Sequence, residues 1–379
     1  YNDLLLDQMP TEEALEGLIA NTYANPDAFA SAVAFPLELV SYDGNENIFA
    51  AYGMGDWKLT DQISVLAGLR YEHTFVDLNG SNQDTSGVIT TLNVTSNYAS
   101  FLPMLHFKFT PLENLNIRAA ITRTLARPSF ADLNPNTVVN SVGGGFVTIN
   151  RGNPGLEPTY SWNFDLLGEY YFKDVGLVSG GLFYKNLSNL IFDNVSQETM
   201  DGNQVRITEP QNLQSASLIG FEVAFSKRLT FLPGALGGFG VDVNYTFTDS
   251  KVDVPTFDPV SLEQTTSEQT LIGQPKHIYN LALFYEKYGF TARIAANFKG
   301  EYIDEYRIEA GPEHYRFYDK NLTLDFSASY SITDNIRVFT EINNLTNEPL
   351  RYYHGITDRP EQIEFYSIRG QAGVRFSIR

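Results

Sequence analysis

Hydrophobic and polar residues alternate along much of this chain with a period of two. Four runs show the pattern most clearly, each with apolar side chains at every second position and mostly polar ones between them: 239–248, 290–299, 322–330 and 366–378. Successive side chains of a β-strand point to opposite faces of the sheet, so each run predicts a strand with one apolar and one polar face. No helical period generates such runs.

The pattern predicts about thirteen strands, joined by connections that alternate between short and long. The predicted strands are 47–59, 63–78, 96–111, 115–127, 158–172, 176–191, 212–229, 238–250, 276–287, 289–303, 320–331, 336–346 and 363–378. Between pairs of strands joined by tight turns lie long loops rich in Gly, Asn, Asp and Thr: 79–95, 128–157, 192–211, 251–275, 304–319 and 347–362.

Two architectures could carry these strands: a soluble antiparallel sheet with one wet face, or a transmembrane barrel. Many predicted strands are longer than the roughly 5–6 residues usual in soluble sheets. A barrel also explains the short and long connections as periplasmic turns and extracellular loops. We therefore predict an all-β, antiparallel transmembrane barrel with a wet lumen. Its predicted lumen-lining residues are Asp165, Glu169, Asp242, Arg293, Asp325 and Arg369.

Residues 1–46 lack the strand pattern. Leu15, Leu18 and Ile19 follow helical spacing, and Thr11 is a suitable N-cap. We favour a short surface helix within an extracellular loop over a helix that binds a partner. Residues 47–379 are then the barrel portion.

Composition and motifs exclude several classes of function. The chain has 26 Lys and Arg against 45 Asp and Glu, a net charge of −19, which argues against a nucleic-acid partner. It has no Cys, so disulfides and thiolate chemistry are excluded. No apolar stretch approaches the roughly 20 residues of a membrane-spanning helix. Nucleotide-binding and hydrolase motifs are absent, so we expect no enzyme, no catalytic or metal site and no cofactor.

Five stretches resemble a known family. The segments 46–72, 123–135, 152–172, 273–286 and 343–355, together with the terminal FYSIRGQAGVRFSIR, are similar to the C-terminal part of TonB-dependent outer-membrane receptors. The likeness is greatest to the group common in carbohydrate-scavenging Gram-negative bacteria, and it covers roughly residues 40–379. It implies an outer-membrane location in a Gram-negative bacterium.

The resemblance also implies a larger assembly. Family members are 22-stranded barrels closed by an N-terminal plug, so a plug and about nine strands are expected before this segment. It implies that the plug engages the TonB–ExbB–ExbD energising complex, and that the barrel contacts outer-membrane lipid and the barrel assembly machinery. A surface lipoprotein is a further candidate partner. The expected assembly signal is Gln371, Gly373, Phe376 and Ile378, although the chain ends in Arg379 rather than an aromatic residue.

The loops after residues 303 and 346 hold the densest aromatic and charged side chains. Aromatic rings with carboxylates and amides suit sugars, whereas aromatic rings with Arg or Lys suit anionic ferric siderophores. An oligosaccharide uptake receptor is the favoured interpretation; a siderophore receptor and a passive porin or structural barrel are the alternatives. The same aromatics could simply pack the loops together. The candidate ligand contacts are Tyr306, Arg307, Tyr315, Arg316, Tyr352, Tyr353 and His354.

Overall fold

The fold is dominated by one curved, mostly antiparallel sheet, seen in a computed structural model that describes residues 39, 41–84, 87–143, 146–200, 203–257, 264–308 and 310–377. Each strand predicted from the sequence is present, with shifted ends. The sheet runs in chain order through β1 (Asp43–Lys58), β2 (Ile63–Gln83), β3 (Ile89–Leu112), β4 (Leu115–Ala126), β7 (Thr159–Tyr171), β8 (Gly176–Met200), β9 (Asn203–Arg228), β10 (Phe239–Phe257), β12 (His277–Lys287), β13 (Phe290–Lys299), β16 (Asn321–Thr333), β17 (Ile336–Asn343) and β20 (Arg369–Phe376).

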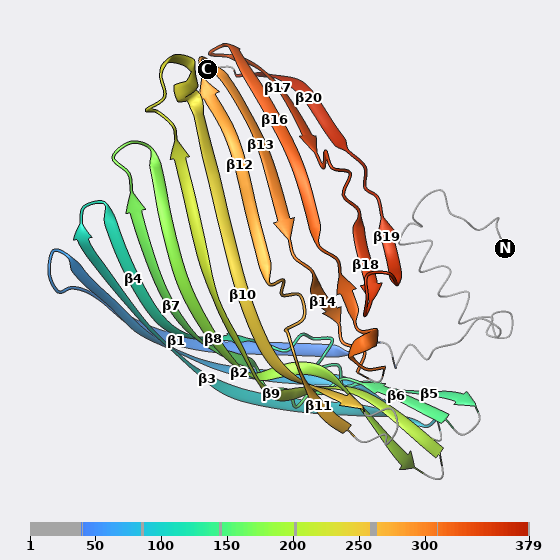
Figure 1. The fold of residues 1–379 in the computed structure, drawn as a ribbon. Helices are drawn as coiled ribbons and strands as arrows, with labels where there is room; N and C mark the ends of the chain where they lie inside the picture. The colour runs from blue at the N-terminus through green and yellow to red at the C-terminus, as the bar shows by residue number, and fades with distance from the viewer. Residues whose placement is uncertain are drawn as a thin grey trace.

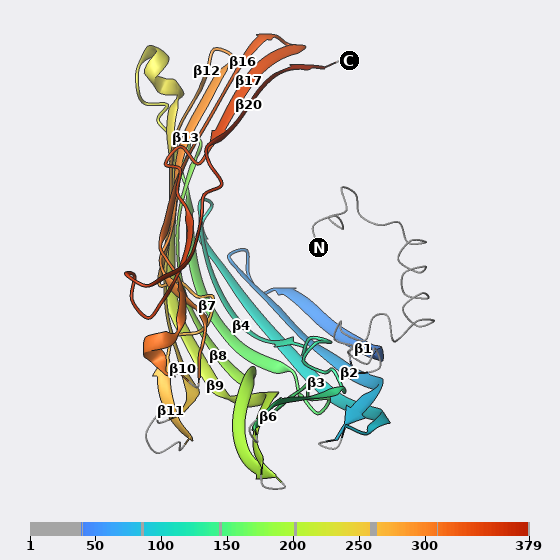
Figure 2. The same cartoon turned by 90° about the vertical axis from the view of Figure 1, so that its right-hand side faces the viewer.

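Strands β1 and β20 form the two edges of this sheet. Among the described residues, β1 pairs only with β2 and β20 only with β17. Figures 1 and 2 show the sheet bending into a trough, with its tight turns along the upper left edge of Figure 1. We call this the short-turn end and the opposite one the long-loop end. The predicted 1–46 region falls largely outside the described residues, although β1 already begins at Asp43.

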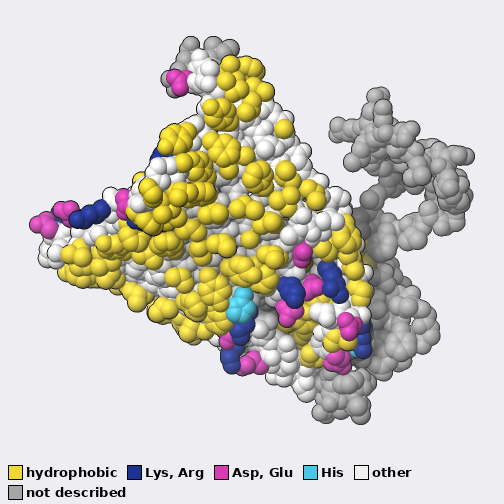
Figure 3. All heavy atoms as spheres, turned by 45° about the horizontal axis from the view of Figure 1, so that its top comes forward, with side chains coloured by type: hydrophobic (Ala, Val, Ile, Leu, Met, Phe, Trp, Pro, Cys, Tyr) yellow, Lys and Arg dark blue, Asp and Glu magenta, His cyan; other side chains and the backbone are white. Residues whose placement is uncertain are grey.

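One face of the sheet is apolar and the other is polar, as the alternation of residues in the sequence predicts. Leu281 and Leu283 on β12 pair with Ala296 and Ile294 on β13, and both leucines are about half exposed. Side chains of this kind make the broad hydrophobic surface of Figure 3. In a soluble protein so large an apolar patch would be unusual, whereas lipid accounts for it.

The opposite face is polar and cross-linked. Arg293 donates to Asp242 at 2.7 Å, Ser226 donates to the same carboxylate at 2.6 Å, and Asn297 donates to Asp325 at 3.0 Å. The six predicted lumen-lining residues all lie on this face. The residues directly before and after each of them on its strand belong to the apolar face. No helix in the described part of the chain is long and apolar enough to cross a membrane.

Three of the predicted long loops are instead extended hairpins. Strand β2 continues to Gln83, and β3 begins at Ile89. Strand β8 continues to Met200, where it pairs with the start of β9 at Asn203. Strand β10 pairs with β11 (Gln264–Gln269). Their Thr- and Asn-rich sequences resemble loops. However, continued pairing satisfies each backbone N–H and C=O even where no apolar face needs covering.

The remaining loops carry small sheets, and the buried clusters among the described residues lie where these loops pack against the extended strands. Strands β14 (Tyr302–Glu305), β15 (Arg316–Tyr318), β18 (Leu350–His354) and β19 (Pro360–Glu364) form a four-stranded sheet, which we call the loop sheet. The hairpin of β5 (Thr137–Gly143) and β6 (Phe146–Arg151) lies beside β9. Short 3₁₀ turns are η2 (Gly234–Gly238) and η3 (Pro312–His314). The largest cluster, the loop core, contains Ala216, Val252, Val254, Ile303, Tyr306, Ile308 and Tyr315.

Candidate ligand-binding site

Three of the predicted ligand contacts are largely buried in this structure. Tyr306, Tyr315 and Tyr353 are 9%, 0% and 4% exposed. The Tyr306 hydroxyl donates to the Thr270 carbonyl, and the Tyr353 hydroxyl donates to Glu301 at 3.0 Å. Burial raises the pKa of both phenols above their usual range, and for Tyr353 the neighbouring Glu301 adds to the effect. Tyr315 and Tyr353 cannot meet a ligand unless the loop sheet opens.

The four other predicted contacts lie together at one end of the loop sheet. Arg307, Arg316 and His354 converge on Glu361 at 3.3, 3.1 and 3.1 Å. The Arg316 guanidinium also lies 3.9 Å from the ring centre of Tyr352. These side chains are half-buried and hold β14, β15, β18 and β19 together; a ligand role for them stays a prediction.

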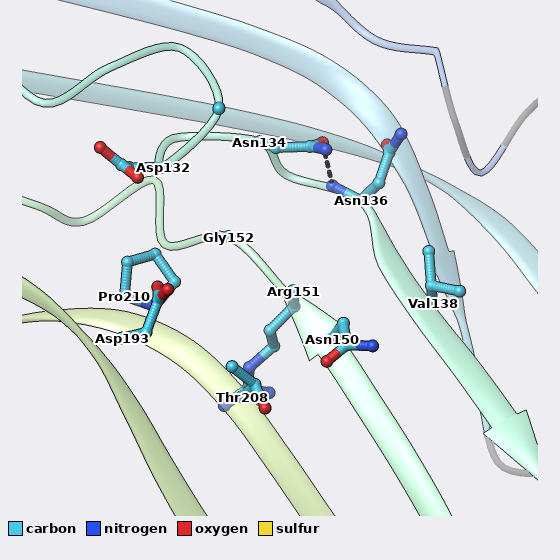
Figure 4. A pocket seen from close by; sticks show the side chains of 11 residues that line it. Asp132, Asn134, Asn136, Val138, Asn150, Arg151, Gly152, Asp193, Thr208 and Pro210 are labelled. Carbon is cyan, nitrogen blue, oxygen red and sulfur yellow. Dashed lines mark hydrogen bonds between the residues drawn. The ribbon is translucent and has the colours of Figure 1, made fainter. Parts of the chain in front are cut away.

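A cavity of about 290 Å³, the first cavity, lies elsewhere at the long-loop end (Figure 4). Residues from the 131–138 segment, β6, β8 and β9 form its wall. They are Ala131, Asp132, Asn134, Asn136, Val138, Asn150, Arg151, Gly152, Asp193, Thr208 and Pro210. Most carry an amide, hydroxyl or carboxylate, so the wall is rich in hydrogen-bonding groups.

Several of these groups are available to a ligand. The Thr208 hydroxyl oxygen is buried and has no hydrogen-bond partner in the described structure, which a native fold tolerates only where water or a ligand supplies one. Asn150 and Asp193 likewise make no side-chain hydrogen bond or ion pair to the described residues. Arg151, by contrast, is ion-paired with Glu209.

The wall is held in place by the run that follows β4. Arg127 is ion-paired with Glu72 and lies 3.9 Å from Glu46. Ser129 and Asp132 exchange hydrogen bonds of 2.7–3.1 Å, which closes a tight turn. Asn136, which is 2% exposed, accepts from the Ser81 N–H at 2.8 Å and donates to two carbonyls before β1.

A second cavity of about 530 Å³ adjoins the first. It lies between the β8–β9 hairpin and the segment after β14, and Asp193 belongs to the walls of both cavities. Its lining combines an apolar floor with charged groups. The residues are Phe192, Asp193, Val195, Arg206, Ile272, Asp304, Glu305, Tyr306, Arg307, Ile308 and Ala310. Of these, only Tyr306 and Arg307 were predicted as contacts from the sequence.

Metal binding finds no support at either cavity. The described residues contain no group of three or more His, Asp and Glu side chains placed to hold a metal ion. The first cavity is lined mainly by hydrogen-bonding groups, and the second also has the aromatic residues Phe192 and Tyr306. Nothing in the sequence pattern marks Asn150, Asp193 or Thr208, because each lies in a stretch that resembles any polar loop.

Comparison with known proteins identifies the fold. The family model described as "TonB dependent receptor-like, beta-barrel" matches residues 14–345. Similar solved structures include the siderophore receptor PiuA from Acinetobacter baumannii (15% identity, TM-score 0.61, 88% of this chain and 44% of that one). The ferric-catecholate import receptor Fiu from E. coli K12 is 13% identical, with a TM-score of 0.59 over 88% and 45% of the two chains. The copper transporter OprC is 14% identical, with a TM-score of 0.62 over 89% and 50%.

These identities show a shared fold, and the chain spans about half the length of the structures it matches. No curated protein matches it. The similar structures are receptors and transporters by their descriptions, whereas the likeness to the carbohydrate group stays a prediction. With the family known, the short-turn end is periplasmic and the long-loop end extracellular. The chain belongs to the TonB-dependent receptor-like β-barrel family and resides in the outer membrane of a Gram-negative bacterium.

Proposed function

We propose that the protein captures a scarce, neutral, hydroxyl-rich solute, an oligosaccharide, at the first cavity and imports it into the periplasm. The observation that carries this proposal is the set of available polar groups on the cavity wall. The Asn150 amide, Thr208 hydroxyl and Asp193 carboxylate each match a sugar hydroxyl as donor or acceptor. Cavities with a few convergent polar groups are the usual form of a small-molecule site.

The charge of the wall supports a neutral ligand over an anionic one. Asp132 and Asp193 both line the first cavity, and its one cation, Arg151, already pairs with Glu209. An anionic chelate would therefore approach two carboxylates. A sugar hydroxyl instead donates to a carboxylate, which is among the stronger hydrogen bonds in proteins.

Import requires energy that a barrel alone does not supply. We propose that a plug domain and the TonB–ExbB–ExbD complex provide it, as the family resemblance implies. Passive diffusion is the alternative mechanism, and dependence of uptake on the membrane potential distinguishes the two.

A ferric siderophore is the second candidate, and one feature favours it. The loop sheet carries Tyr302 stacked on Tyr318 at 5.0 Å, with the Lys299 amine 4.2 Å from the Tyr302 ring centre. Cations beside aromatic rings suit an anionic aromatic chelate. Two of the similar structures are also described as siderophore or ferric-catecholate receptors.

Replacing Asn150 with Ala tests the oligosaccharide proposal. In the full receptor in outer-membrane vesicles, we expect the variant to bind a neutral oligosaccharide roughly 5- to 10-fold more weakly, because a typical hydrogen bond contributes about 1 kcal/mol. The probes are linear gluco-, xylo- and manno-oligosaccharides and a ferric catecholate complex. Lys299→Ala is the matched variant for the siderophore alternative.

Each outcome of this experiment is decisive. Saccharide binding that N150A weakens and K299A leaves unchanged supports the proposal. If the receptor binds no saccharide but binds ferric catecholate, and K299A weakens that binding, the result supports the siderophore candidate instead. Binding of neither probe class overturns both.

Binding should also depend on pH through Asp193. Partial desolvation beside the neighbouring segments, together with the negative charge of Asp132, raises the pKa of the solvent-accessible Asp193 carboxyl above its usual range. The ionised form is the better acceptor, so affinity should be constant above the raised pKa and fall as pH drops through it. Measured affinity against pH should show this fall, and Asp193→Asn should remove it.

The matched control is Glu198→Gln, an equivalent change on the exposed far part of the same hairpin. Its pH profile should follow the parent protein. A D193N variant that retains the fall in affinity would show that another group controls it.

A further inference from the structure

We propose that the two cavities are halves of one elongated groove, and that the ligand is a linear oligosaccharide long enough to reach from Asn150 to Phe192 and Tyr306. This inference rests on the proposed function and adds the length and shape of the substrate. A single sugar ring would occupy only the first cavity.

The register of the β8–β9 hairpin places both cavities on one surface. Asp193 pairs with Pro210, and Val195 pairs with Thr208. Paired residues of an antiparallel ladder point to the same face. Asp193, Pro210 and Thr208 line the first cavity, while Asp193 and Val195 line the second. Asp193, Val195 and Thr208 therefore present one face to a ligand that passes from the first cavity to the second, while Phe192 lies on the alternate face of β8 and reaches the second cavity beside Tyr306.

The two halves offer complementary chemistry. The first cavity is polar, as described above. The second is larger and has aromatic side chains in its floor: Phe192 and Tyr306, whose ring centres are 5.8 Å apart at an interplanar angle of 32°. Sugar rings have apolar C–H faces and polar edges, so they suit a site with aromatic surface below and charged groups at the rim. Asp304 and Glu305 supply charged groups to the lining of the second cavity.

Volume favours a chain over a compact solute. At about 290 Å³ the first cavity lies at the lower limit of the roughly 300–1,000 Å³ typical of ligand pockets. The second, at about 530 Å³, lies well within this range. A compact ligand in either half would leave the other half to water, whereas a linear chain fills both.

A length series tests the groove. Oligosaccharides of one to seven residues, of the type that the full receptor binds, are titrated by calorimetry. We expect affinity to rise at least 10-fold from one residue to the length that reaches the second cavity, and then to level off. Phe192→Ala should abolish this rise and leave the affinity for a single residue unchanged.

Two further variants separate binding from folding. Ile272, 43% exposed in the second half, can be replaced by Ser with little effect on packing, and I272S should also weaken only the longer ligands. Glu198→Gln on the same hairpin should bind every length like the parent. Asn150→Ala should weaken all lengths equally.

The outcomes distinguish this inference from the proposed function. If no saccharide of any length binds, the proposed function fails. If saccharides bind with an affinity independent of length, the elongated groove is overturned while the proposed function stands. The groove is also overturned if F192A and I272S weaken all lengths to the same extent, because that result indicates one compact site.

Discussion

Replacing Leu281 by Arg is expected to destabilise the folded barrel by about 2–4 kcal/mol, the cost of a cation at the lipid midplane of a β-barrel. Leu281 lies in the middle of β12, is 49% exposed and belongs to the apolar face. In lipid the guanidinium would lose its hydration without gaining a partner. Urea unfolding of the full receptor in lipid vesicles measures the effect.

Asn280→Arg is the matched control, because it places the same charge one residue away on the opposite face. Asn280 already donates to Asn244 at 2.7 Å among polar neighbours, so the change should cost less than about 1 kcal/mol of surface hydrogen bonding. Equal destabilisation by both variants would contradict the assignment of the two faces.

Replacing Asn136 by Ala should detach the segment before β1 from the first cavity. The amide makes three hydrogen bonds of 2.8–3.0 Å in a nearly inaccessible position. Each buried group left without a partner costs about 1–3 kcal/mol, so we expect a loss of about 3 kcal/mol in local stability. Hydrogen exchange at the Ser81 amide should accelerate about 100-fold.

Asn134→Ala provides the comparison. Asn134 lies in the same segment, but its side chain only accepts the 2.9 Å bond from the Asn136 N–H, so the loss should be near 1 kcal/mol. If Ser81 exchanges at the parent rate in N136A, the amide does not hold the segment as the geometry indicates.

The strands of the membrane-facing sheet could be predicted from the sequence because one physical constraint governs them. Lipid on one side and water on the other impose strict alternation, as in β12 and β13, where every second residue is apolar. That constraint ends where the strands leave the membrane. Beyond it, the paired extensions of β8 and β9 follow no such pattern, and the sequence there resembles an irregular loop.

The candidate site was much harder to predict for the same reason. The aromatic residues around 306 and 315 attract attention because they are chemically distinctive, yet Tyr315 is completely buried in the loop core. Asn150 and Thr208 are common polar residues, far apart in the sequence. Only the parallel pairing of β6 with β9 brings them opposite one another, and long-range register between loops leaves no local signal.

The β8–β9 hairpin stands far outside the membrane. Strand β8 has 25 residues, about 80 Å at 3.3 Å per residue, whereas crossing the bilayer takes roughly 9–11 residues. More than half of it is therefore above the lipid. Substitutions in the described part of this extension need not alter barrel insertion, because these residues do not contact lipid. Sequence change on this hairpin can thus alter the walls of both cavities without altering the membrane-spanning sheet.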